Sequence, residues 1–262
     1  MTKMPPPLAL AYHALGDVPL TRDWYRLFVR PKDLRRHIEK LRSWRYRTAT
    51  FGELATAVAN GGGAGMVALT FDDGFEDNAT VLASLLADMQ AKATVFVISG
   101  RLGQNHHEVP WARMMSEAQV RELHDGGIEI GAHTVTHPDL TSLAYDDALA
   151  ELATSKAQLE DIVSAPISTA AYPYGAADER VLEACREAGF VAACRTSGRG
   201  SWSEPLNLPR QDVGNRQSAL AFYLKRDDRY EPAIKPLLPL IATKPARFAI
   251  KVIRHYRSAG RA

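Results

Sequence analysis

The chain contains few cysteines and no long apolar run. Its two cysteines, Cys185 and Cys194, do not form a C-x-x-C site, and two are too few for a disulfide framework. We expect both to be buried free thiols, which makes a reducing compartment, the cytoplasm, the default location. No apolar stretch reaches the roughly 20 residues that a membrane-spanning helix needs. The first residues carry three prolines and no small-residue cleavage site, so they predict a strand better than a signal peptide.

A strong excess of one charge is also absent, because the formal net charge of the 262 residues is +2. The hydrophobic share of 46% is typical of a soluble globular protein. Residues 231–262 nevertheless contain seven Lys or Arg and one acid, a balance of +6, which leaves −4 for residues 1–230. We therefore expect a catalytic domain over residues 1–230 and a basic, partly amphipathic tail over residues 231–262. No nucleic-acid partner is expected.

Hydrophobic periodicity predicts alternating strands and helices. Strands are expected at residues 7–13, 66–71, 93–99, 128–133, 168–173, 190–195 and 206–213. Helices are expected at residues 31–44, 50–60, 77–89, 116–127, 146–163 and 178–189. Such alternation favours a parallel sheet with helices outside it. Polar clusters follow residues 12, 71, 132 and 171, each at a strand end, so we predict an α/β fold: a distorted (β/α)7-type barrel with mostly parallel strands.

Two adjacent acids, Asp72 and Asp73, follow the apolar segment "MVALTF". Burying two like charges side by side is costly unless something neutralises them. In extended backbone neighbouring side chains point to opposite sides, so the two acids can have different roles. A cation bound by Asp73 would neutralise one carboxylate and leave Asp72 beside it as a base.

Two histidines, His133 and His137, stand four residues apart in "GAHTVTHPD", just after another predicted strand. On a helical turn or a compact loop this spacing points both imidazoles the same way. A pair of this kind that stands alone is more often two surface or capping residues. Together with the carboxylate of Asp73, however, it forms a three-ligand metal site that leaves a coordination position for water.

Three motifs in this order, "TFDDG", "HTVTH" and "AYPYG", resemble those of the polysaccharide deacetylase family (NodB homology domain, carbohydrate esterase family 4). The resemblance implies that Asp72 is the catalytic base and that the backbone N–H of Tyr174 donates to the oxyanion. It also implies a divalent cation, most often zinc, with cobalt, nickel or iron as alternatives. The residues that would hold this cation are Asp73, His133 and His137.

The sequence departs from the family pattern at two places within the resembling residues, 7–215. The third motif of the family begins with an arginine that steadies the base, and Ala171 stands there instead. Arg210 could replace it, although a surface position is the more frequent outcome for such a residue. The family's late Leu-x-His motif, its usual source of a general acid, is missing. His13 resembles the displaced acid of a subgroup similar to the poly-N-acetylglucosamine deacetylases; the alternative is a hydrogen-bonded histidine at a strand end.

The function implied by the resemblance is a metal-dependent hydrolase that removes the N-acetyl group from a sugar of a cell-envelope or lipid-linked saccharide. A deformylase or other C–N amide hydrolase on a lipid-linked amino sugar remains an alternative, as does a saccharide-binding homologue without turnover. Trp111, Trp202 and Tyr172 could stack on a sugar, although core packing is the more frequent role of such residues. No residue pattern indicates an oligomeric state.

The basic tail ends in an amphipathic pattern over residues 244–262. Four apolar side chains recur there at helical spacing, and four basic side chains fall largely on other faces. They are Phe248, Val252, Ile253 and Tyr256, and Arg247, Lys251, Arg254 and Arg257. This pattern predicts peripheral binding to an anionic membrane at its inner face, where a lipid-linked saccharide could be reached. The alternative is a helix docked on the barrel with its basic face in water.

Overall fold

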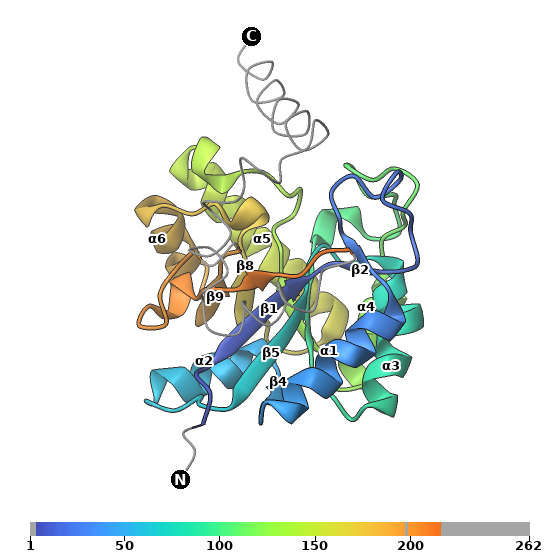
Figure 1. Cartoon of the computed structure of the whole chain (residues 1–262). Coiled ribbons are helices and arrows are strands. Elements are labelled where there is room, and N and C mark those ends of the chain that lie inside the picture. Colours follow the sequence, from blue (N-terminus) through green and yellow to red (C-terminus); the bar gives the residue numbers. More distant parts are fainter. Residues whose placement is uncertain (1–3, 197–198, 216–262) are drawn as a thin grey trace, which may run out of the picture. The chain divides into compact units, whose positions relative to one another are not determined.

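The computed structural model describes residues 4–196 and 199–215. Strands stand at the centre of this part of the chain, and helices surround them (Figure 1). The main strands are β1 (Leu8–Tyr12), β4 (Arg47–Ala49), β5 (Met66–Phe71), β6 (Thr94–Val97), β7 (Glu129–Ala132), β8 (Thr169–Ala171), β9 (Ala192–Cys194) and β10 (Gln211–Asp212). The α-helices are α1 (Pro31–Ser43), α2 (Phe51–Ala59), α3 (Ala83–Asp88), α4 (Glu117–Asp125), α5 (Tyr145–Val163) and α6 (Glu179–Glu187).

The strands form a parallel sheet that curls back on itself in the order β10-β1-β5-β6-β7-β8-β9. Leu208 pairs with Cys194 at the end of β9, and three residues later β10 pairs with β1. The segment that contains Leu208 and β10 therefore fills the gap between the first and last strands. This closure confirms the predicted α/β fold with a distorted seven-stranded parallel barrel.

Two short features escaped the sequence prediction. The first residues of β5 pair with β4, and its last residues pair with β6. A small separate sheet joins β2 (Ala14–Leu15) to β3 (Phe28–Val29). Strands of two or three residues are too short to show an alternating pattern. β2 is fixed by the backbone N–H of Leu15, which donates to Asp77 Oδ1 at 2.7 Å and so joins β2 to the segment that follows β5.

The buried faces of the elements follow the sequence pattern. Every residue of β1 and β5 is buried, as expected for strands covered on both faces. In α1 the buried side chains are Leu34, Ile38 and Leu41, which share one helical face. α2 begins with the expected capping box, in which Thr50 and Glu53 exchange side-chain to backbone hydrogen bonds.

The helix predicted at residues 77–89 begins differently, with a π-helical turn at Asn78–Leu82 before α3. Such turns are rare in proteins, and those that occur are often found at functional sites. Here the turn buries Asn78, whose Nδ2 donates to the backbone carbonyl of His13 at 3.1 Å. The widened turn therefore ties the end of β1 to the segment that follows Asp73.

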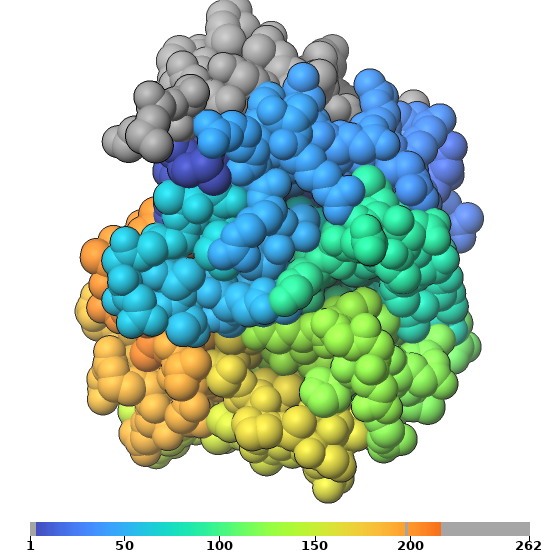
Figure 2. Space-filling view, turned by 90° about the horizontal axis from the view of Figure 1, so that it is seen from below, coloured from blue at the N-terminus to red at the C-terminus, as the bar shows by residue number. Residues whose placement is uncertain are grey.

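Early and late parts of the chain adjoin on the face seen from below, where residues near 60 (cyan) lie beside those near 200 (orange) in Figure 2. Trp202 packs there, partly buried, against the core cluster that contains Phe51 and Leu54. No helix in residues 4–196 or 199–215 is long and apolar enough to span a membrane. The predicted domain boundary at residue 230 and the basic tail lie outside the described residues.

Candidate active site

Four of the central strands end beside one another at the same side of the barrel. Tyr12 at the end of β1 pairs with Phe71 at the end of β5, and Val97 of β6 pairs with Ala132 at the end of β7. Because the strands are parallel, the residues that follow them meet at one face. Those residues include the predicted acids and histidines, and the aromatic turn follows the neighbouring strand β8, whose Ala170 pairs with Ala132.

Asp73, His133 and His137 form a buried cluster at this face. Asp73 Oδ1 lies 3.5 Å from His133 Nε2 and 3.6 Å from His137 Nε2. Two ligand atoms bound tetrahedrally to one zinc-like ion at about 2.0–2.2 Å are themselves about 3.3–3.6 Å apart. The spacing and the donor types therefore fit a divalent cation, and the ligand set alone does not select the metal.

The loop after β7 turns both histidines toward Asp73, as the sequence predicted. Thr134 and His137 have positive φ values of 64° and 66°, and Asp73 has a φ of 74°. Such values are uncommon outside glycine and tend to occur where function constrains the backbone. The loop is held by Thr134 Oγ1, which accepts a hydrogen bond from His137 N at 3.0 Å, and by Glu151 of α5, which accepts two further backbone N–H groups.

Both histidines of the cluster can present a neutral nitrogen to a cation. His133 Nδ1 lies 2.7 Å from the backbone oxygen of Ala171, which fixes the proton on Nδ1 and leaves Nε2 as the acceptor nitrogen. Burial, reinforced by the neighbouring His133, lowers the pKa of His137 to about 3. A neutral imidazole is the form that binds a metal. Ala171 thus contributes its carbonyl group to the site, although its side chain is not the expected arginine.

Arg210 forms a bidentate ion pair with Asp72. The two guanidinium nitrogens donate to Asp72 Oδ1 at 2.7 Å and to Oδ2 at 2.8 Å, and Arg210 is fully buried. The surface position favoured from the sequence is therefore wrong. Arg210 lies in the segment that closes the barrel, between Leu208 and β10, so its side chain points inward and reaches Asp72.

The two neighbouring acids have different partners. Burial acts to raise the pKa of Asp72, but Arg210, followed by His133, outweighs burial and holds that pKa below its ordinary range. Arg210 also donates to Thr70 Oγ1 at 2.7 Å, which fixes the guanidinium in place. Asp72 is therefore an ionised, oriented carboxylate, while Asp73 faces the histidines.

His13 and Tyr174 reach the same site from β1 and β8. His13 is half-buried. Burial, the largest influence, acts to raise the pKa of Asp72 and of Asp73, and His13 is among the groups that lower both values. Tyr174 lies in the turn Pro173–Gly175 with a φ of 58°. Its ring centroid is 4.7 Å from that of His137, and its hydroxyl donates to Glu108 Oε1 at 3.1 Å. The structure thus brings together all six residues that the sequence singled out for the site.

His106 belongs to the site although the sequence assigned it no role. It is buried, and its Nε2 lies 3.3 Å from Asp73 Oδ2. It stands in the loop between β6 and α4, with no motif around it that predicts contact with Asp73. No local sequence pattern points to His106, because only the fold brings it close to Asp73.

The three candidate stacking residues have different environments. Tyr172 is fully buried and donates its hydroxyl hydrogen to the backbone oxygen of Leu206, so it cannot contact a sugar. Trp202 packs against the core. Trp111 is 38% exposed. The two cysteines are buried and unpaired, as expected.

Comparison with known proteins places these observations in a family. The model of the polysaccharide deacetylase family matches residues 59–193. The Bacillus subtilis protein YxkH is 29% identical over 163 residues, which cover 61% of this chain and 56% of YxkH. The chitooligosaccharide deacetylase of Sinorhizobium fredii is 30% identical over 154 residues, 58% of this chain and 66% of that protein. The chain thus spans less than two thirds of the length of these relatives.

Solved structures share the fold over most of the chain. The Streptococcus pyogenes deacetylase PplD, solved with acetate, matches with a TM-score of 0.73 and 25% identity, over 86% of this chain and 99% of that one. IcaB from Ammonifex degensii matches with a TM-score of 0.70 over 87% of this chain and 98% of its own. Its identity of 19% makes it a comparison of folds alone.

Proposed function

The chain belongs to the polysaccharide deacetylase family, and on this premise we propose that it is a metal-dependent hydrolase that removes the acetyl group from an N-acetylated sugar. One observation carries the proposal: the buried cluster of Asp73, His133 and His137 lies beside a second acid, Asp72, that Arg210 orients. Each of these side chains has a distinct part in the hydrolysis of a C–N bond that is not a peptide bond.

Asp73, His133 and His137 would hold the cation. Zinc is the first choice for a set of two imidazoles and one carboxylate, and cobalt, nickel and iron are the alternatives. When bound, a divalent cation supplies Lewis acidity to an acyl carbonyl and to water. The buried, neutral state of His137 supports this role, because the imidazole needs no deprotonation before it binds.

Asp72 is the general base and accepts a proton from the attacking water. Its two hydrogen bonds from Arg210 leave each carboxylate oxygen with further acceptor capacity. The same hydrogen bonds hold the carboxylate in one orientation and favour its ionised form. A positioned base of this kind contributes about 10²–10⁴-fold to the rate.

His13 and Tyr174 complete the reaction. As the water oxygen bonds to the acyl carbon, the backbone N–H of Tyr174 donates to the developing oxyanion, a type of contact worth roughly 3–4 kcal/mol. Protonated His13 then gives a proton to the leaving nitrogen as the C–N bond breaks. The products are acetate and a free amino sugar. The position of His13 directly after β1, ahead of the three motifs, supports the subgroup that resembles poly-N-acetylglucosamine deacetylases.

The saccharide is proposed to belong to the cell envelope or to be linked to a lipid, and the enzyme to act in the cytoplasm at the inner membrane face. This part of the proposal depends on the sequence of residues 244–262. A deformylase acting on a lipid-linked amino sugar would use the same metal cluster, so only the group released distinguishes it. A saccharide-binding homologue without turnover is less well supported, since Arg210 supplies the arginine that Ala171 lacks.

The test is the identity of the acid released from a panel of N-acyl sugars. The full chain would be stripped with a chelator, reloaded with zinc and incubated with N-acetylglucosamine, N-acetyl chitooligosaccharides and their N-formyl counterparts. We expect zinc-dependent acetate release. Faster formate release would favour the deformylase, and release of neither acid would leave a binding protein.

A further inference from the structure

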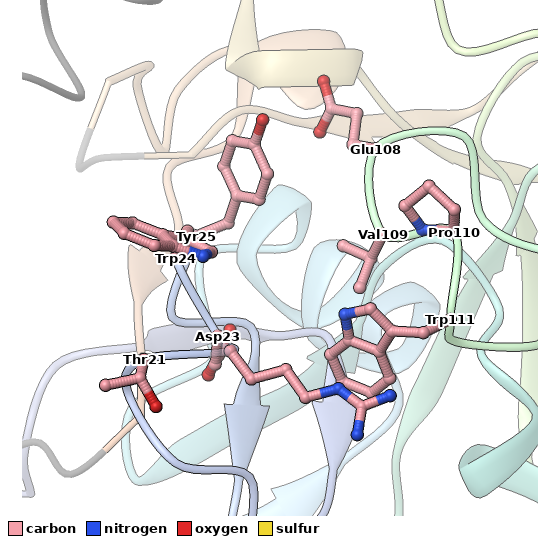
Figure 3. A pocket seen from close by; sticks show the side chains of 9 residues that line it. Thr21, Asp23, Trp24, Tyr25, Glu108, Val109, Pro110 and Trp111 are labelled. Carbon is pink, nitrogen blue, oxygen red and sulfur yellow. The ribbon is translucent and has the colours of Figure 1, made fainter.

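A cleft with a volume of about 320 Å³ opens between two loops that come from distant parts of the sequence. One loop joins β2 to β3 and supplies Arg22, Trp24 and Tyr25; the other joins β6 to α4 and supplies Glu108 and Trp111. Figure 3 shows Trp24 and Tyr25 on one side of the opening and Glu108 and Trp111 on the other. The volume lies at the lower end of the range of ligand pockets, about 300–1,000 Å³.

The exposed aromatic side chains of the described residues gather at this cleft. Trp24 is 70% exposed, Tyr25 52% and Trp111 38%, and all three line it. The fourth, Tyr174, is 50% exposed and donates its hydroxyl hydrogen to Glu108 in the cleft wall. Within residues 4–196 and 199–215 no other Phe, Tyr or Trp is exposed to this degree. A cluster of exposed aromatic side chains marks a surface that binds a ligand or another molecule.

The cleft is held in shape before any ligand arrives. Asp23 is buried beneath the first loop, where its carboxylate accepts hydrogen bonds from Leu27 N at 2.8 Å and Phe28 N at 3.0 Å. Trp111 stacks on Phe28, with ring centroids 4.9 Å apart, and the guanidinium of Arg22 lies 4.2 Å from the centroid of the Trp111 ring. The two loops are therefore packed against each other, and Arg22 is fixed with its N–H donors at the cleft.

The side chain of Glu108 links the cleft to the candidate active site. Glu108 lines the cleft and accepts the hydroxyl hydrogen of Tyr174, and the Tyr174 ring lies 4.7 Å from that of His137. A molecule that filled the cleft would therefore contact Glu108, which holds the hydroxyl of Tyr174 beside His137 of the metal cluster.

We propose that this cleft is a second saccharide subsite, which binds the neighbouring sugar unit of a chain whose N-acetyl group is at the metal cluster. Trp24 and Tyr25 offer flat apolar surfaces to the C–H face of a sugar ring. Arg22 and Glu108 offer a donor and an acceptor to its hydroxyl and amide groups. The inference rests on the proposed deacetylase function and makes the substrate an oligomer of at least two sugar units.

The experiment compares free N-acetylglucosamine with N-acetyl chitooligosaccharides of increasing length. In the wild type, KM should fall when a second unit is added. Trp24→Ala and Tyr25→Ala should each raise KM for the oligomers by about 2- to 10-fold, as expected for the loss of one ring contact. Trp44→Ala removes an indole that is not part of the cleft and should leave KM for the oligomers at the wild-type value.

Binding measured without turnover separates this inference from the proposed function. N-acetyl chitotetraose should change the tryptophan fluorescence of the full chain, and Trp24→Ala should weaken that binding. If the tetramer binds in this way but no acid is released from any sugar, the proposed function is wrong and the cleft is still a saccharide-binding site. If deacetylation is independent of chain length and Trp24→Ala binds the tetramer as the wild type does, the subsite is overturned.

A second inference concerns His106 and depends on a separate set of contacts. His106 Nδ1 accepts hydrogen bonds from the backbone N–H groups of Glu108 and Val109, both at 3.1 Å. A nitrogen that accepts carries no proton, so the hydrogen of the neutral ring is on Nε2. The ring is stacked on Phe75, with centroids 4.8 Å apart, and cannot turn freely.

This Nε2–H faces the oxygen of Asp73 that the cluster does not use. Nε2 lies 3.3 Å from Asp73 Oδ2, whereas Oδ1 is the oxygen near His133 and His137. Nε2 is buried and, among the described residues, makes no hydrogen bond of good geometry. His106 is also outside the set of three residues whose ligand atoms lie close together.

We infer that His106 is a positioning residue, which donates Nε2–H to Asp73 Oδ2 and so holds Oδ1 toward the two histidines. A ligand carboxylate restrained in this way binds its cation more tightly, and loss of such a partner typically costs 10–100-fold in metal affinity. Metal affinity, measured by competition with a chelating dye, is therefore the readout.

We expect His106→Ala to weaken zinc binding by about 10–100-fold, and His106→Gln, which restores an N–H donor, to recover part of the loss. His124→Ala, which removes a histidine of α4, should bind zinc as the wild type does. The absorption spectrum of the cobalt-loaded His106→Ala protein should keep its wild-type shape, because no ligand is lost. Unchanged zinc affinity in His106→Ala, equal losses in the Ala and Gln variants, or a cobalt spectrum with one ligand fewer would overturn the inference.

Discussion

The polar side chains at the strand ends are buried and paired, whereas the aromatic side chains in the loop after β2 are exposed to solvent. Asp72 and Asp73 are 2% and 4% exposed and have charged or polar partners, because an unpaired buried carboxylate would be too costly. Trp24 and Tyr25 in the loop after β2 are 70% and 52% exposed. If Trp24 and Tyr25 bind sugar as proposed, the reaction and the choice of substrate depend on separate parts of the chain. Substitutions in one part should therefore leave the other intact.

The largest effect is expected from the cation ligands at the strand ends. Asp73→Asn or His137→Ala should reduce bound zinc to well below one per chain and abolish turnover, because each removes one of three ligands. Elemental analysis of the purified proteins measures the metal, and tetramer binding in the cleft should persist in both variants. Wild-type metal content in either variant would show that the ligands have been wrongly assigned.

A large effect on turnover alone is expected from His13. His13→Ala should retain zinc and lose about 10²–10⁴-fold in turnover, the contribution of a positioned general acid. His124→Ala, which removes a histidine of α4, is the matched control. Near-normal turnover in His13→Ala would return His13 to the role of a hydrogen-bonded histidine at a strand end.

Arg210 tests whether the strand-end region depends on its buried ion pair. Arg210→Met leaves Asp72 buried without its partner and should lower the free energy of unfolding by about 3–5 kcal/mol. Arg186→Met, at an exposed position on α6, should change it by no more than about 0.5 kcal/mol. Denaturant unfolding measures both.

A double variant sharpens the result for Arg210. Removing the charge of Asp72 as well, in Arg210→Met with Asp72→Asn, should recover part of the lost stability, because no uncompensated carboxylate is then buried. If the two single losses simply add, the bidentate pair does not couple the residues energetically.

The smallest effect is expected from the basic end of the chain, which belongs to neither region. Each Lys or Arg near an anionic leaflet contributes about 1 kcal/mol, and salt screens the attraction. Co-sedimentation with anionic liposomes should therefore fall at high salt and on removal of residues 244–262. Binding that is absent, or that the truncation does not change, would argue for a soluble sugar deacetylase with a basic tail.

The sequence predicted which residues meet at the strand ends, because the patterns that contain them are local. Asp72 and Asp73 directly follow an apolar strand, and His133 and His137 share one short loop. The Arg210–Asp72 pair joins residues 138 positions apart, and no local pattern links them. His106 escaped for the same reason. The cleft escaped because irregular loops have no periodicity, so the sequence did not indicate that Trp24 and Trp111 would line the same opening.

The roles of the two neighbouring acids are tested by a paired measurement on Asp72→Asn: zinc bound per chain, and acetate released from an N-acetyl chitooligosaccharide. The substitution keeps the shape of the side chain and removes its ability to accept a proton. Because Asp73 and the histidines are unchanged, we expect wild-type zinc content with turnover lower by about 10²–10⁴-fold. Zinc lost in parallel with activity, or acetate released at the wild-type rate, would show that Asp72 is not a general base beside the metal cluster.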